Sequence, residues 1–177
     1  MKDMEDYFIV FDLDGTLVDT DKANSMAYQQ SVFDVTKKIV NMDDGRLTRD
    51  WVQSQIKVGD DIMQEIISRK EKLFSEYLIH TTPMPALFIL RHLKNTHNIL
   101  LTQARRKRAE MVLDYYGVTS FFDNLYCRDS YSGNSKFDYL VNEQHCSPNK
   151  IILFENEQKT IAEAMRFGIP QKNIYKS

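Results

Sequence analysis

Two acidic residues, Asp12 and Asp14, stand where a short apolar run from Tyr7 to Leu13 meets Gly15. Two carboxylates this close together repel one another unless a cation or a proton offsets their charge. Phosphoryl transfer can use such a pair, because one carboxylate attacks phosphorus while the other gives a proton to the leaving group and later takes one from water. For the Asp-x-Asp-Gly spacing alone, a solvated acidic loop is the competing interpretation.

The run that precedes these acids is rich in aromatic and β-branched residues, which is typical of a strand buried on both faces of a parallel sheet. Later segments resemble it, two clearly and two weakly: 98–102, 150–154, 124–127 and 173–175. Between them, apolar side chains recur at helical spacing, and Gly117 and Gly168 close two of these helical segments. Alternating strands and helices predict an α/β fold with a parallel sheet that binds its ligand at the carboxyl ends of the strands.

The interval 18–84 interrupts this alternation. Its apolar residues follow helical spacing, no convincing strand lies among them, and a Thr-Thr-Pro-Met-Pro segment ends the interval at Pro85. Three helices are expected: 21–40, 48–56 and 60–78. We therefore predict a core made of 1–17 and 85–177, with an inserted helical block at 18–84. The alternative at this stage is that the block belongs to one continuous core.

The composition of the chain excludes several classes of protein. Of its 177 residues, 42% are hydrophobic and 27% are charged, and the formal net charge of −2 favours neither nucleic acid nor an anionic membrane. No apolar run approaches the roughly 20 residues of a membrane helix, and the charged N-terminus lacks a signal-type apolar core. Cys127 and Cys146 are too few for a disulfide framework. We expect a cytoplasmic protein that binds no nucleic acid and no membrane.

The string Phe11-Asp-Leu-Asp-Gly-Thr-Leu-Val-Asp-Thr20 closely resembles the first motif of the haloacid-dehalogenase-like superfamily. The resemblance implies that Asp12 is a nucleophile that becomes an aspartyl phosphate. It implies that Asp14 is the general acid and base and offers its backbone carbonyl to Mg²⁺. It also implies a Rossmann-like parallel sheet flanked by helices, with the inserted helical block serving as a cap over the strand ends.

Two later segments are similar to the second and third motifs of that family. Thr102 ends the second strand, and the resemblance implies that its hydroxyl and the backbone N–H of Gln103 hold the substrate phosphate, although asparagine is commoner after the hydroxyl residue. Lys136 matches the third-motif lysine, which would neutralise the nucleophile and the phosphoryl group, although Phe137 replaces the usual proline. The basic run 105–108 after the second motif is interpreted as a solvated helix face in preference to a substrate contact.

The segment 151–161 resembles the fourth motif of the β-phosphoglucomutase-like branch, with departures. Glu155 matches the first acid, whereas Asn156 replaces the aspartate that usually ligates Mg²⁺, and Thr160 replaces an acid of the commoner form. Mg²⁺ wants hard oxygen ligands and tolerates waters, so an asparagine carbonyl can serve but lacks the charge. We expect weakened binding of Mg²⁺ at a site that the resemblance assigns to four residues: Asp12, Asp14, Glu155 and Asn156.

The inserted block is also loosely similar to the cap of that branch. Arg46 and Arg49 lie in a segment similar to its Gly-x-Ser-Arg stretch, and they could bind a distal anionic group of the substrate through paired hydrogen bonds. Ordinary surface arginines are the alternative for at least one of them.

Together, these resemblances imply a Mg²⁺-dependent phosphatase of a small phosphorylated metabolite. Two alternatives stay open. A phosphomutase of the same branch would differ by excluding water from the site. A catalytically weakened member would only bind a ligand or partner, which the replacements at Asn156 and Thr160 suggest. The sequence does not identify the substrate, because its specificity would be set by the cap.

Overall fold

The computed structural model describes residues 7–41, 47–93, 96–133 and 135–177, and the chain divides into two compact units. The first unit comprises Met1–Val18 and Pro83–Ser177, and it contains a parallel sheet. The second unit, Asp19–Thr82, is helical. Each unit has its own buried core.

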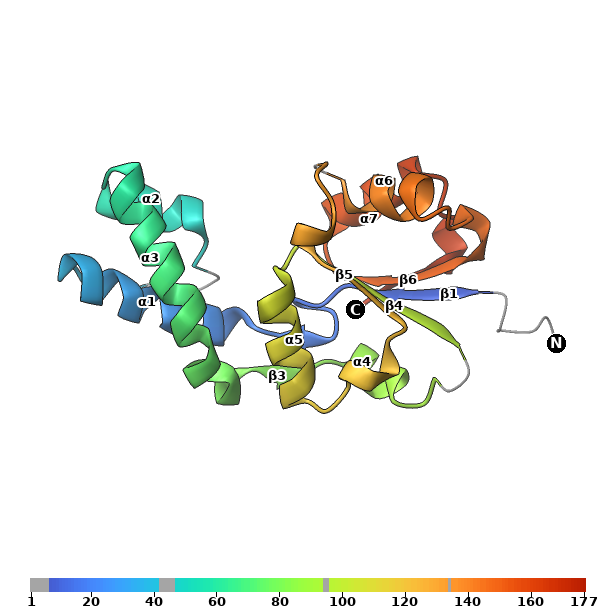
Figure 1. Ribbon diagram of the computed structural model, residues 1–177, viewed down its shortest axis with the longest axis horizontal. Coiled ribbons are helices and arrows are strands. Elements are labelled where there is room, and N and C mark those ends of the chain that lie inside the picture. The colour runs from blue at the N-terminus through green and yellow to red at the C-terminus, as the bar shows by residue number, and fades with distance from the viewer. Residues whose placement is uncertain (1–6, 42–46, 94–95, 134) are drawn as a thin grey trace. The chain divides into compact units, whose positions relative to one another are not determined.

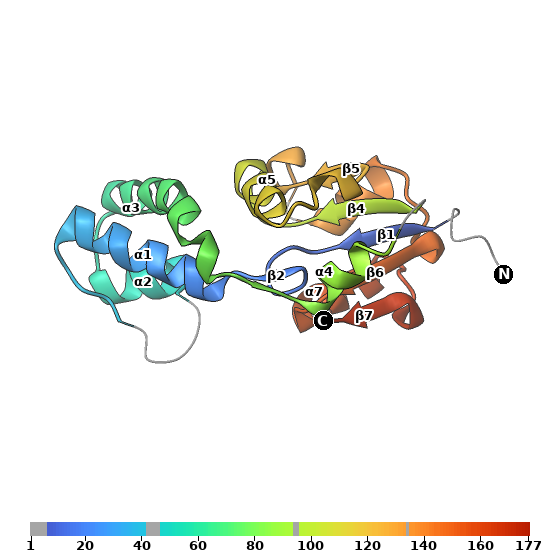
Figure 2. The same cartoon turned by 90° about the horizontal axis from the view of Figure 1, so that it is seen from below.

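The first unit is built on a five-stranded parallel sheet with the strand order β5-β4-β1-β6-β7 (Figures 1 and 2). Its strands are β1 (Phe8–Phe11), β4 (His97–Leu101), β5 (Asn124–Tyr126), β6 (Ile151–Glu155) and β7 (Ile174–Lys176). β1 lies between β4 and β6, with Val10 opposite both Ile99 and Leu153. Parallel neighbours need crossover connections, usually helices, that cover the faces of the sheet. The predicted α/β fold is confirmed, and all five predicted strands are present.

Helices lie on both sides of this sheet, with α6 and α7 above it and α4 and α5 below it in the view of Figure 1. They are α4 (Pro85–Leu90), α5 (Arg106–Tyr115), α6 (Lys136–Asp138), which continues as the π-helical turn η5 (Tyr139–Glu143), and α7 (Gln158–Arg166). Gly117 and Gly168 have φ angles of 64° and 87° just after α5 and α7. These left-handed conformations are the helix stops that the sequence predicts.

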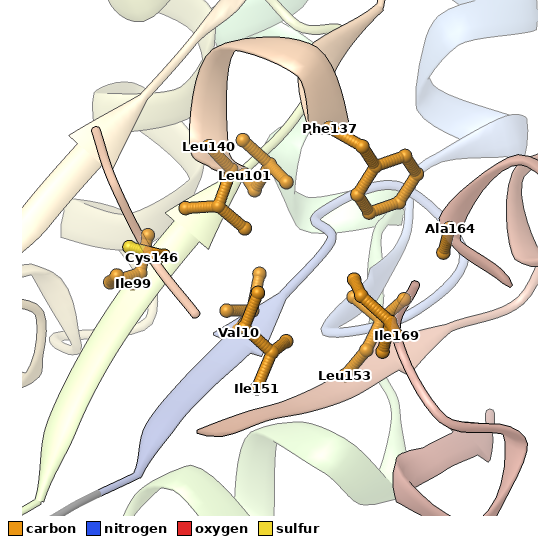
Figure 3. Packing of buried hydrophobic residues seen from close by; sticks show 10 residues of the cluster. All are labelled: Val10, Ile99, Leu101, Phe137, Leu140, Cys146, Ile151, Leu153, Ala164 and Ile169. Atoms are coloured by element: carbon orange, nitrogen blue, oxygen red, sulfur yellow. The ribbon is translucent and has the colours of Figure 1, made fainter. Parts of the chain in front are cut away.

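One face of the sheet packs into a hydrophobic cluster (Figure 3). Val10, Ile99 and Leu153, from three adjacent strands, belong to this cluster together with Phe137 of α6 and Ala164 of α7, and Ile99 lies beside Cys146. Both cysteines are free thiols and both are buried, Cys146 within this cluster. The burial explains why the strand sequences are almost continuously apolar and do not alternate between apolar and polar residues.

The second unit consists of α1 (Asp21–Thr36), α2 (Arg49–Ile56), α3 (Asp60–Leu73) and the 3₁₀ segment η2 (Phe74–His80). α2 begins after Thr48, whose hydroxyl accepts a hydrogen bond from the Trp51 N–H at 3.2 Å, a standard N-cap. α1 packs against α3 and η2. Eight buried side chains form the core of this unit: Tyr28, Val32, Val40, Leu47, Val52, Ile56, Met63 and Ile66.

Two short strands, β2 (Val18–Asp19) and β3 (Thr82–Pro83), pair with each other where the chain leaves and re-enters the first unit. The prediction of no strand within 18–84 is therefore wrong at both ends of that interval. A two-residue strand is too short to show the alternation by which strands are predicted. No helix in the described part of the chain is long and apolar enough to cross a membrane.

Candidate functional site

Polar residues follow three adjacent strands of the sheet at their carboxyl ends. Asp12 comes directly after β1, Thr102 directly after β4, and Glu155 closes β6. The register pairs Phe11 with Leu100 on one side and with Phe154 on the other, and the Asp12 N–H donates to the Phe154 carbonyl at 3.0 Å. Parallel strands in this register bring their following residues to one edge of the sheet, where α/β proteins bind ligands.

Lys136, the first residue of α6, reaches this edge from outside the sheet. Its Nζ donates to Asp12 Oδ1 at 2.7 Å, to Glu155 Oε2 at 2.9 Å and to the Leu101 carbonyl at 3.1 Å. The side chains of Lys136 and Glu155 are only 3% and 2% exposed. The predicted motif residues therefore meet as one buried ion network, in which a single ammonium group joins two carboxylates.

The buried position of this network changes its protonation. Burial raises the pKa of Asp12 to about 7 from its ordinary 3.8, although the ammonium of Lys136 opposes the shift. Burial also opposes the charge on Lys136, but the carboxylates of Asp12 and Glu155 outweigh it and raise the pKa of Lys136. Lys136 is therefore a permanent cation, and Asp12 is the group whose charge responds near neutral pH.

Glu155 has protein partners on both carboxylate oxygens. Oε2 accepts the hydrogen bond from Lys136, while Oε1 accepts from the backbone N–H groups of Asn156 and Glu157 at 2.9 and 3.0 Å. These contacts fix the loop between β6 and α7 as well as the lysine. In this arrangement Glu155 serves to hold other groups in place.

Asn156 lies against the turn that carries the two aspartates. The Thr16 hydroxyl donates to Asn156 Oδ1 at 3.4 Å. A Cβ atom at Gly15 would overlap Asn156 Nδ2, and Gly15 has a φ of 77°. The turn therefore needs glycine both for its backbone conformation and for the close approach of Asn156.

Asp14 forms an ion pair that the sequence did not indicate. Arg108 Nη2 donates to Asp14 Oδ1 at 2.7 Å, and the two side chains are 10% and 16% exposed. The interpretation of the run 105–108 as a solvated face is thus wrong for Arg108, although the other three residues are exposed. Helical spacing could have found it, because Arg108 is four residues from the buried Val112 and therefore on the inward face of α5.

The predicted phosphate-binding residues differ in their surroundings. Thr102 is buried, and its Oγ1 accepts a hydrogen bond from the Ala104 N–H at 3.1 Å, which shapes the loop before α5. Gln103 is exposed. Of the two predicted cap arginines, Arg49 is the exposed first residue of α2 in the second unit, and Arg46 lies outside the described residues.

The residues assigned to the magnesium site offer only oxygen donors and little negative charge. Among the described residues no group of three or more histidine, cysteine, aspartate and glutamate side chains could hold a metal ion. The assigned donors are the carboxylates of Asp12 and Glu155, the carbonyl of Asp14 and the amide oxygen of Asn156, and the three side chains among them also accept hydrogen bonds from the protein. Mg²⁺ binds through one or two carboxylates and keeps several waters, which such a set permits.

Comparison with known proteins places this chain in a family. A model of the haloacid dehalogenase-like hydrolase family matches residues 9–173. No curated protein sequence matches the chain.

Solved structures share the fold at low sequence identity. A predicted phosphoglycolate phosphatase from Haemophilus somnus 129pt superposes with a TM-score of 0.74 at 19% identity, covering 93% of this chain and 83% of that one. A candidate β-phosphoglucomutase from Thermotoga maritima gives 0.71 at 20% identity, covering 96% and 84%. A subfamily IA hydrolase from Geobacter sulfurreducens PCA gives 0.71 at 14% identity, covering 93% and 84%. The family model spans nearly the whole chain, and this protein is a member of the haloacid dehalogenase-like hydrolase family.

Proposed function

We propose that this protein is a Mg²⁺-dependent phosphatase that hydrolyses a small phosphorylated metabolite through an aspartyl phosphate on Asp12. The observation that carries the proposal is the buried network in which Lys136 bridges Asp12 and Glu155 at 2.7 and 2.9 Å. A permanent cation beside the attacking carboxylate offsets the charge of an incoming phosphate dianion. It also keeps Asp12 partly ionised in spite of its burial.

In the proposed reaction, a carboxylate oxygen of Asp12 forms a bond to phosphorus while the bond to the ester oxygen breaks. Asp14 gives a proton to that departing oxygen and so becomes a base. Asp14 then takes a proton from water as the water oxygen attacks phosphorus, which releases inorganic phosphate and restores Asp12. Lys136 stays beside the phosphoryl group through both steps, and the loop at Thr102 holds its oxygens.

Magnesium completes the proposed site. Asp12, the Asp14 carbonyl, Glu155 and Asn156 would hold it, and Glu155 would also fix the position of Lys136. When bound, Mg²⁺ supplies positive charge next to the phosphate oxygens. The protein's own residues bind and orient the substrate and transfer the protons. Because the amide of Asn156 is neutral, the affinity of the site for Mg²⁺ is expected to be low.

The helical second unit, Asp19–Thr82, is proposed to act as the cap that sets specificity, with Arg49 as a contact for an anionic group of the substrate. A guanidinium recognises carboxylate or phosphate with paired hydrogen bonds. This role agrees with the exposure of Arg49 at the start of α2. A metabolite that carries a second anionic group is therefore the expected class of substrate.

The experiment that tests the function is a panel of phosphorylated sugars, nucleotides and two-carbon acids, each assayed with Mg²⁺ for released phosphate. Wild type should hydrolyse a subset of the panel, and Asp12→Asn should abolish this activity because an amide does not attack phosphorus at a useful rate. Asp123→Asn makes the same chemical change at an exposed position of the same unit and should stay active. An isomerised phosphate ester as the product would identify a mutase, whereas a lack of turnover at every Mg²⁺ concentration would show a binding protein.

A further inference from the structure

The basic run 105–108 contains one residue that behaves differently from its neighbours. Arg105, Arg106 and Lys107 are exposed. Arg106 Nη2 donates a hydrogen bond to the Leu125 carbonyl at 2.7 Å. Arg108 is 9% exposed and points from the first turn of α5 to the carboxylate of Asp14. A guanidinium is rarely buried without a specific partner, so this placement requires a local explanation.

The turn that carries Asp14 is already held through its backbone. The Gly15 N–H donates to the Val18 carbonyl at 2.8 Å, and Asp14 forms a bridge with Val18. These bonds fix the position of the Asp14 backbone but do not determine where its carboxylate points. The charged hydrogen bond from Arg108 acts on the direction of the carboxylate, because α5 anchors the guanidinium and the bond is short and directional.

We propose that Arg108 is a positioning residue, which holds the carboxylate of Asp14 in the orientation needed for proton transfer; this inference rests on the proposed phosphatase function. Asp14 has to meet two partners at nearly the same point, the departing oxygen in the first step and the attacking water in the second. A carboxylate that can rotate freely would spend less time at that point. Misplacement of a reacting group by about 1 Å can cost about 100-fold in rate.

The test uses Arg108→Met, which removes the charge and the hydrogen bonds but keeps a long unbranched side chain, with Lys107→Met as the matched control. Lys107 loses the same charge one residue away on the exposed face of the same helix. On an alkyl phosphate, kcat of Arg108→Met should fall by about 10- to 100-fold with KM nearly unchanged. Lys107→Met should match wild type, and Arg108→Lys should lie between them because an ammonium pairs with a carboxylate without the geometry of the guanidinium fork.

A double-mutant cycle separates positioning from direct contact with the substrate. If Arg108 acts through Asp14, adding Arg108→Met to Asp14→Asn should cause no further loss of kcat. A second readout follows from the order of the steps. An aryl phosphate such as p-nitrophenyl phosphate needs little proton donation to its leaving group, so Arg108→Met should release one rapid equivalent of nitrophenol and then slow down, while phosphorylated Asp12 accumulates.

Several results would overturn the positioning role while leaving the phosphatase function intact. One is an active wild type in which Arg108→Met behaves like Lys107→Met; another is a further loss of kcat when Arg108→Met is added to Asp14→Asn. A change confined to KM would also overturn it, since it would mark Arg108 as a substrate contact. If Arg108→Met does not fold, Arg108→Lys is compared with wild type in its place. The double variant Asp14→Asn/Arg108→Met, in which both charges are removed, is still compared with Asp14→Asn. A wild type that hydrolyses nothing would instead remove the proposed function, and the positioning role with it.

Discussion

Replacing Asn156 by aspartate should strengthen the binding of Mg²⁺, because it adds a charge where the site has little. Three carboxylates (Asp12, Asp14 and Glu155) and two basic side chains (Lys136 and Arg108) meet at the site, a net charge of −1 when all are ionised. Asn156→Asp makes this −2. The new carboxylate can keep the hydrogen bond that the Thr16 hydroxyl donates, so the loop need not move.

The size of the effect follows from the position of the residue. Two unit charges 4 Å apart attract by about 1 kcal/mol in water and by about 4 kcal/mol at the effective dielectric constant near a protein surface. Asn156 is half-buried, and desolvation of the new carboxylate cancels part of the gain. We expect a net gain of about 1.4 to 2.8 kcal/mol, which is about 10- to 100-fold in affinity.

Isothermal titration calorimetry of the metal-free proteins with MgCl₂ measures this directly, without relying on turnover. The control is Asn149→Asp, which adds the same charge at an exposed residue before β6, at the opposite end of that strand from the site. Wild type should bind weakly, Asn156→Asp more tightly, and Asn149→Asp like wild type. Saturation of the wild type at low micromolar Mg²⁺, or equally tightened binding in both variants, would contradict this expectation.

Three further outcomes are expected. Burial raises the pKa of Asp12 to about 7, so the folded protein retains a proton that the unfolded chain releases near the ordinary pKa of 3.8. The unfolding free energy of the metal-free protein should therefore fall as pH rises between these values, and Asp12→Asn should flatten the profile measured by urea unfolding. Gly15→Ala should cost about 1–3 kcal/mol in the same assay because of the positive φ and the contact with Asn156, whereas Gly133→Ala, with no atom within 4 Å of the added Cβ, should change little. Arg49→Ala should alter the ranking of substrates in the panel more than hydrolysis of p-nitrophenyl phosphate, with the exposed Lys72→Ala as control; an equal loss on all esters would contradict a role in specificity.

The fold could be predicted because each main strand has a recognisable local sequence pattern. The runs that became β1, β4 and β6 are apolar, short and bounded by polar residues, and a parallel sheet buried on both faces leaves that signature. Such runs also fix where Asp12, Thr102 and Glu155 stand, since each follows or closes a strand. The predicted helices of 18–84 are present with shifted ends, because helix termini are decided by caps and by packing that apolar spacing does not encode.

The part of the site that the sequence did not show depends on side-chain directions. Four consecutive basic residues look alike, and only the phase of α5 sends Arg108 inward to Asp14 while Lys107 stays exposed. Likewise, the resemblance assigns Glu155 only to the metal, and the contacts of its oxygens with Lys136 and the following backbone N–H groups appear only in the structure. Long-range pairs of this kind form only when distant segments are brought together by the fold.

Asp12 is proposed to carry the phosphoryl group during turnover, and the most direct measurement is to find the group there. Wild-type protein is mixed with Mg²⁺ and the best substrate of the panel, quenched in acid within the first turnover, digested and mapped by mass spectrometry. We expect a phosphorylated peptide whose modified residue is Asp12 and which disappears in Asp12→Asn together with turnover. Phosphate release at the wild-type rate by Asp12→Asn, or a phosphoryl group trapped on a different residue, would contradict it.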